Sequence, residues 1–146
     1  MAEHVHSTAE SLCLTFTNTA SARVDGTLKE QLHSYEDLLA WGEREGALPA
    51  SSAAQLAVFA RSSPQQARGM LHAAVELREA LYRIFTAHAE RREPPADDLS
   101  MLNRVLAQTL PHLQLAAGPE GFTWEWNEDE LDLGRMLWPV ARSAAD

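Results

Sequence analysis

The feature that most constrains the fold is one long segment with prolines at both ends. Ser63-Pro64-Gln65-Gln66 places a hydroxyl, a proline and an amide where helices favour them at their start. Pro94-Pro95 prevents the helix from continuing far beyond Arg91. At about 100° per residue, the apolar side chains between these limits cover an arc of roughly 180°. The segment therefore predicts a long amphipathic helix whose apolar face consists of Ala67, Met70, Leu71, Ala74, Val75, Leu77, Leu81, Tyr82, Ile84 and Phe85.

Shorter helices are predicted on both sides of this segment. Ser34 and Asp37 resemble a capping box, and Gly46 marks the end of the helix that they open. Two more apolar patterns with helical spacing cover residues 52–61 and 97–110. Pro139 can open a last helix, although the sequence stops at Asp146 within about two turns.

Two regions have the two-residue period of strands. Residues 11–17 alternate between apolar and polar residues, and residues 113–117 and 122–126 do the same on either side of a Gly118-Pro119-Glu120-Gly121 turn. Residues 20–31 contain few apolar side chains and predict a surface loop. The expected fold class is α+β: a mainly helical single domain with an N-terminal strand and a C-terminal β-hairpin packed on a helical layer.

The composition indicates one soluble globular domain. The chain has 146 residues, of which 45% are hydrophobic, and no apolar run approaches the roughly 20 residues of a membrane helix. Residues 1–10 are too polar for a secretory signal, so we expect a cytoplasmic protein without a membrane partner. Cys13 is the single cysteine, which excludes an internal disulfide and a cysteine-rich zinc site. No metal or other cofactor is expected in this chain.

The charge balance disfavours nucleic-acid binding. Twelve basic and twenty-one acidic residues give a formal net charge of −9, which repels phosphate on average. The acidic stretch at residues 128–132 lacks the spacing and the glycine of a calcium-binding loop and predicts a solvated loop. No phosphate-binding glycine loop, nucleophile motif or metalloprotease motif is present, so no enzymatic activity is predicted.

Arg78 falls near the centre of the apolar arc of the long helix. A guanidinium has five donors and stays charged, so burying it is costly unless acceptors and an anion satisfy it. The partner can be an internal carboxylate, helix-end carbonyls or solvent reached by an extended side chain. Alternatively, Arg78 lines a pocket and pairs with an anionic group of a small ligand, for which its planar fork is well suited.

Other residues have two interpretations as well. The chain has four tryptophans, which can build the core, but Trp124 and Trp126 on a hairpin could instead form the wall of an aromatic pocket. Asn103 lies at the edge of an apolar helical stripe, where its amide can bond to a loop or to a ligand.

Six motifs in order resemble one known family. They are Leu12-Cys13-Leu14-Thr15-Phe16-Thr17-Asn18-Thr19, Ser34-Tyr35-Glu36-Asp37-Leu38-Leu39-Ala40-Trp41, Leu77-Arg78-Glu79-Ala80-Leu81-Tyr82, Leu102-Asn103, Phe122-Thr123-Trp124-Glu125-Trp126 and Leu137-Trp138-Pro139-Val140-Ala141-Arg142-Ser143-Ala144. Their order is similar to that of the ABATE domain, the amino-terminal half of bacterial proteins described as stress-induced transcription regulators. The similarity covers nearly all of residues 1–146. It implies an α+β domain with a ligand-sensing or regulatory role.

The chain departs from the family pattern in two places. Thr15 stands where the family usually has aspartate, which removes one possible internal partner of Arg78. Family members normally continue past the last helix into a zinc finger with a Cys-Gly-Asn-Arg signature, proposed to bind DNA, and this chain lacks it. The resemblance thus implies that zinc and DNA contact belong to that missing part and that the final helix is cut short.

The first functional hypothesis is a non-catalytic sensor domain of a transcription regulator with a small anionic ligand. Its polar residues would supply charge pairing and hydrogen bonds, and its aromatic residues would form the walls. The candidate pocket residues are Arg78, Tyr82, Asn103, Asn18, Thr19, Trp124 and Trp138. The alternative is a protein-interaction or homodimerisation module without a ligand, in which the last helix and Trp138 make the contact.

Overall fold

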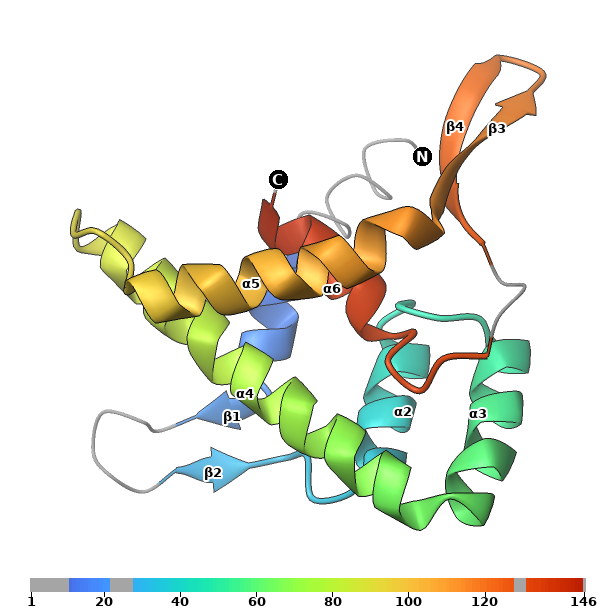
Figure 1. The fold of residues 1–146 in the computed structure, drawn as a ribbon, viewed down its shortest axis with the longest axis horizontal. Helices are drawn as coiled ribbons and strands as arrows, with labels where there is room; N and C mark the ends of the chain where they lie inside the picture. The colour runs from blue at the N-terminus through green and yellow to red at the C-terminus, as the bar shows by residue number, and fades with distance from the viewer. Residues whose placement is uncertain (1–10, 22–27, 128–130, 146) are drawn as a thin grey trace.

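The structure is a computed structural model that describes residues 11–21, 28–127 and 131–145 (Figure 1). Residues 11–17 are helical. The elements that follow are β1 (Ala20–Ser21), β2 (Lys29–Glu30), α2 (Tyr35–Arg44), α3 (Ala50–Ser62), α4 (Pro64–Ala89), α5 (Ala96–Thr109), a 3₁₀ turn η1 (Leu110–His112), β3 (Leu113–Gly118), β4 (Gly121–Trp126) and α6 (Leu137–Ala145). This composition confirms the expected mainly helical α+β class.

The long helix α4 organises the domain. Helices α2 and α3 pack beside its first half, and α5 packs on α4 and on α6 (Figure 1). Arg83 of α4 donates two hydrogen bonds to the buried carboxylate of Asp98, at 2.8 and 2.9 Å, and so ties α4 to α5. Phe16 and Trp41 meet in the core with ring centroids 5.2 Å apart. The largest apolar side chains that are fully buried are Phe16, Leu38, Leu56, Leu77, Leu81, Met136 and Val140.

The structure confirms the predicted start and end of α2 and the predicted start of α4. Ser34 caps α2, because its hydroxyl accepts a hydrogen bond from the backbone N–H of Asp37 at 3.2 Å. Gly46 follows α2 with φ +76°, a conformation that favours glycine. Pro64 is the first residue of α4, as predicted, although the Ser63 hydroxyl makes no capping bond. The last helix begins at Leu137, two residues before the predicted Pro139.

The predicted strand at residues 11–17 is wrong, because this segment is helical. Leu12 and Phe16 are buried and lie four residues apart on one face, whereas Leu14 between them is 50% exposed. Thr15 donates its hydroxyl to the carbonyl of Ser11 and Thr17 to that of Leu14, at 3.1 and 2.8 Å. These local bonds let threonine fit a helix. Three alternating pairs are too few to distinguish the two-residue period of a strand from the period of a helix.

The predicted loop at residues 20–31 contains a short ladder instead. Its two ends form β1 and β2, which pair antiparallel with Ala20 opposite Glu30. Residues 22–27 of this prediction, and residues 128–130 of the predicted acidic loop, lie outside the described residues. The ladder matters for the site because it brings Glu30 next to α4.

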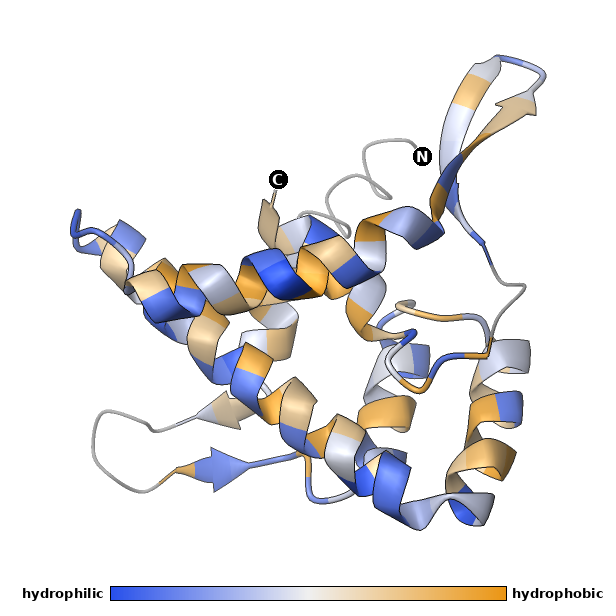
Figure 2. Cartoon of the chain, in the orientation of Figure 1, coloured by the Kyte–Doolittle hydropathy of each residue, from blue (hydrophilic) through white to orange (hydrophobic). Residues whose placement is uncertain are grey.

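The predicted C-terminal hairpin is confirmed, and its strands pair from Leu113 opposite Trp126 to Gly118 opposite Gly121. Its base packs on helices and the guanidinium of Arg142 in α6 lies over the ring of Trp124, while its turn projects away from the helices (Figure 1). Hydrophobic stretches lie on both strands of the hairpin (Figure 2). The expected packing of the hairpin on the helical layer therefore does not extend to its turn.

Candidate functional site

Arg78 is the most buried charged residue described, with 1% of its surface exposed, and the chain itself supplies its partners. Its Nη1 and Nη2 donate to the two carboxylate oxygens of Glu30, at 2.5 and 2.8 Å, in a bidentate pair. Its Nε donates to Glu79 Oε2 at 2.7 Å. Nη1 also lies 3.5 Å from the hydroxyl of Thr19. The internal-carboxylate alternative is thus the one that the structure supports.

Electrostatics stabilise this cluster in its charged form. Burial by itself raises the pKa of Glu30, but hydrogen bonds from Arg78 and from the Leu32 N–H, together with the positive charge, outweigh burial and lower it. Burial opposes the charge of Arg78 too, but Glu30 and Glu79 hold its pKa above the ordinary value. Both directions favour the charged forms of Glu30 and Arg78 near neutral pH.

The lowered pKa of Glu30 predicts a loss of stability in acid. Because the folded pKa lies below the ordinary value of 4.5, the stabilising contribution of Glu30 is complete above that pH and is lost as the pH falls through the folded pKa. We expect the difference in free energy of unfolding between the native chain and a Glu30→Gln variant to shrink as the pH drops below 4.5. Urea unfolding at a series of pH values measures it. A difference that stays constant from neutral to acidic pH would contradict the assignment.

The other predicted pocket residues do not all gather at Arg78. Thr19 does, and it is buried, with its hydroxyl donating to the carbonyl of Phe16 at 2.7 Å. Tyr82 is half-buried on α4, whereas Asn18 and Asn103 are exposed. Trp124 and Trp138 belong to the hairpin and to α6. The ligand role of these residues stays a prediction, but the fold distributes them over at least two places.

Sequence reasoning missed the two glutamates. Glu79 follows Arg78 directly, and this adjacency was the available signal. Glu30 lies 48 residues earlier, in a segment without a motif, so nothing in the sequence pointed to it. Thr15, where the family usually has aspartate, donates to Ser11 within its own helix.

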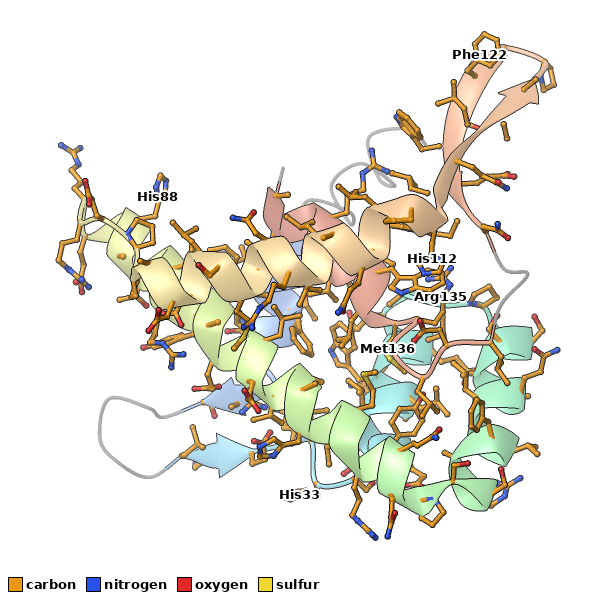
Figure 3. The ribbon with its side chains drawn as sticks, in the orientation of Figure 1. His33, His88, His112, Phe122, Arg135 and Met136 are labelled. Carbon is orange, nitrogen blue, oxygen red and sulfur yellow. The ribbon has the colours of Figure 1, made fainter. Side chains whose placement is uncertain are left out.

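A second cluster holds the base of the hairpin. The ring of Trp138 in α6 stacks on His112, with centroids 4.0 Å apart and planes within 8° of parallel. Trp126 of β4 lies 5.8 Å from Trp138. The guanidinium of Arg135 sits 4.9 Å from the Trp138 centroid, and its Nη1 donates to the carbonyl of Ala47 at 3.1 Å. His112 and Arg135 lie close together beneath the end of α5 (Figure 3).

Trp138 is therefore buried at the base of the hairpin. It is 4% exposed, and Val140 and Ala141 next to it in α6 are fully buried. The interaction hypothesis expected the last helix and Trp138 to form an exposed contact, and their burial corrects this placement. The physical reason is that α6 packs on α5, so its apolar side already has a partner within the chain.

A group of exposed apolar side chains lies together on the hairpin. Successive side chains of a strand point to opposite faces of the sheet. Every second cross-strand pair therefore lies on the same face, and one face holds the pairs Leu113–Trp126, Leu115–Trp124 and Ala117–Phe122. Exposure along this face rises outward from the half-buried base pair, with Leu115 at 53%, Trp124 at 57% and Phe122 at 75%. Figure 3 shows Phe122 near the turn, far from the helices. The opposite face is polar: Gln114 donates to Glu125 across the strands at 3.4 Å.

A comparison with known protein families identifies the family of this chain. The sequence model of the ABATE family, described as "Putative stress-induced transcription regulator", matches residues 10–146. The chain belongs to the ABATE family. No curated protein and no solved structure matches it.

Within the described residues, no three histidine, cysteine or acidic side chains come together as metal ligands. No described helix combines the length and apolar character needed to cross a membrane. A shallow groove of about 360 Å³ lies between α2 and α3, and none of the predicted pocket residues lines it. Neither the hairpin face nor the Arg78 cluster lines this groove.

Proposed function

We propose that this ABATE domain is a non-catalytic regulatory domain that acts through protein contact, with the apolar face of the β3–β4 hairpin as its contact surface. The observation that carries the proposal is the exposure of Phe122, Trp124 and Leu115 on one side of a projecting hairpin. Contiguous exposed apolar side chains on an otherwise folded protein mark interaction sites, and aromatic residues dominate the energy of such sites. The family's description supports a regulatory role.

The satisfied state of Arg78 supports contact over the sensing of a small anion. An anionic ligand would have to replace the Glu30 carboxylate, which already makes two charge-assisted hydrogen bonds to the guanidinium. Arg78 itself is 1% exposed, so the ligand would also have to open the β1–β2 ladder that holds Glu30 in place. Both steps oppose the binding of an anion at Arg78. Contact with a protein at the hairpin face requires neither step.

The proposal predicts that the native domain binds a neutral apolar probe at the hairpin and no small anion at Arg78. We expect Nile red fluorescence to rise with the native chain at about 1 µM, where weak contacts between proteins are dissociated. A Phe122→Ser, Trp124→Ser variant should lose this signal, and a matched Gln114→Ser, Thr123→Ser variant of the polar face should keep it. In the second arm, a panel of small carboxylates and phosphates should leave the melting temperature unchanged.

Two results would contradict this assignment. Equal dye binding by both double variants would mean that the dye does not bind at the apolar face of the hairpin. An anion that raises the melting temperature of the native chain, but not that of an Arg78→Gln variant, would favour the sensor hypothesis.

A further inference from the structure

We infer that the groove between α2 and α3 is a second docking surface of this domain, and that its occupant is a basic amphipathic helix of another protein. The inference is independent of the proposed function, because the groove shares no residue with the hairpin face. It depends on the uncharged outer surface of α3, on two glutamates along α2, and on the lack of a matching helix in the described part of this chain.

The outer surface of α3 carries almost no charge. Arg61 in the last turn is the one charged residue of α3, although 23% of the whole chain is charged. Ala50, Ala54 and Val58 are exposed at intervals of four residues, so they form one apolar strip along the helix. A helix at a protein surface normally carries polar and charged residues on its outer face. This strip is therefore an apolar helix face that no described residue covers.

The groove gives this face a hollow shape. Helices α2 and α3 lie side by side (Figure 1), and the space between them has a volume of about 360 Å³. The wall that α3 contributes consists of alanines alone, namely Ala50, Ala53, Ala54 and Ala57. Because an alanine side chain ends at Cβ, this wall leaves room for the larger side chains of a partner, as when the ridge of one helix packs into the groove of another. The shape therefore fits a helix with large aliphatic residues on one side.

The wall that α2 contributes is acidic. Glu36 and Glu43 both line the groove and are exposed, and neither carboxylate forms a hydrogen bond or an ion pair with a described residue. The two residues are seven positions apart, which places them on the same side of α2, about 10 Å apart along the helix axis. The groove thus has one acidic wall and one uncharged wall. A helix with two basic residues seven positions apart on one edge would meet both carboxylates while its aliphatic side faces α3.

The charges also select among the classes of occupant. The phosphates of a nucleic acid or a lipid would face two carboxylates on a chain with a formal net charge of −9. A second copy lacks the complementary element, because no described helix of this chain contains two arginine or lysine residues seven positions apart. A small cation could pair with the carboxylates but would leave the apolar strip of α3 uncovered. A basic helix of another protein satisfies both walls.

Fluorescence anisotropy of a labelled peptide tests the inference with the full chain. The probe is a peptide of about 18 residues, because shorter peptides form little helix in water. It carries leucines along one side and two lysines seven positions apart on one edge of that side. A second peptide has the same composition, but its lysines lie opposite the leucines. Titration with about 1 to 500 µM of the chain covers transient contacts, and the second peptide should bind roughly fivefold more weakly than the first.

A charge variant with a matched control identifies the carboxylates. The Glu36→Gln, Glu43→Gln variant should raise the dissociation constant of the first peptide roughly fivefold, because each exposed ion pair contributes modestly. The Glu93→Gln, Asp97→Asn variant changes the net charge equally at the turn between α4 and α5, far from α2 and α3 (Figure 1), and should leave the constant nearly unchanged. More salt should weaken the binding of the first peptide, because salt screens exposed ion pairs.

A second pair of variants tests the groove itself. Ala54→Lys places a cation and a long side chain inside the groove and should raise the dissociation constant about tenfold or more. Ala73→Lys makes the same change at an exposed position of α4 outside the groove and should have little effect. All six substituted residues are exposed, so circular dichroism can verify that each variant keeps the native helices.

Four outcomes would overturn the inference. Absence of binding up to the highest concentration would show that the groove does not accept a basic helix. An equal loss in the Glu93→Gln, Asp97→Asn variant would indicate general attraction to an acidic chain. Displacement of the peptide by an equal concentration of an aliphatic diamine would assign the carboxylates to a small cation. Loss of binding in the Phe122→Ser, Trp124→Ser variant, with the groove variants unchanged, would place the peptide on the hairpin and leave the proposed function standing.

Discussion

Replacing Arg78 by methionine should lower the free energy of unfolding by about 3 to 5 kcal/mol, because the change removes a fully buried cation from two partly buried carboxylates. Arg78 is 1% exposed and holds Glu30 by two hydrogen bonds and Glu79 by one. The same change also releases the β1–β2 ladder, since Glu30 is its link to α4. Urea unfolding followed by circular dichroism measures the loss at neutral pH.

The control for this prediction is a double variant in which both Arg78 and Glu30 are replaced. An Arg78→Met, Glu30→Leu variant removes cation and anion together, so it should recover part of the stability that Arg78→Met loses. Arg92→Met is a second comparison, because Arg92 also pairs with a carboxylate, that of Glu90, but both side chains are exposed and the change should cost less. If Arg78→Met loses no more than Arg92→Met, burial does not decide the strength of this cluster and the assignment fails.

Replacing Trp138 by alanine should cost about 3 to 5 kcal/mol as well, for a different reason. The indole is 4% exposed and contacts His112, Trp126 and Arg135, so the change leaves a cavity where η1, β4 and α6 meet. We also expect the hairpin to lose its fixed position, because Trp126 and His112 flank its two strands. Faster amide hydrogen exchange at the base of β3 and β4 would report this loosening.

Trp124→Ala provides the matched comparison. The same change of residue on the exposed face, where Trp124 is 57% exposed, should cost less than about 1 kcal/mol. Chemical unfolding of both variants under one condition compares them directly. Similar losses for the two would mean that the hairpin is held along its whole length, against the exposure described above.

Several parts of the fold could be predicted because their signals are local. Ser34, Gly46 and Pro64 set helix boundaries through hydrogen bonds and backbone angles that depend on neighbouring residues only. The β3–β4 hairpin is also local, since a turn at Pro119-Glu120 joins two alternating runs. The prediction for residues 11–17 failed because their apolar pattern fits the period of a strand as well as that of a helix. Burial of Leu12 and Phe16 against distant residues decided for the helix.

The sequence by itself determined the family, the helices α2 to α6 and the presence of one cation on an apolar helical face. It could not determine what meets that cation, because Glu30 reaches Arg78 across 48 residues and only the folded chain joins them. Nor could it separate the two kinds of tryptophan: Trp138 is covered because α6 packs on α5, whereas Trp124 lies on a hairpin that extends beyond the helices. Burial and charge pairing between distant segments are properties of the packed tertiary structure, so only that structure shows which carboxylates meet Arg78 and which tryptophan is exposed.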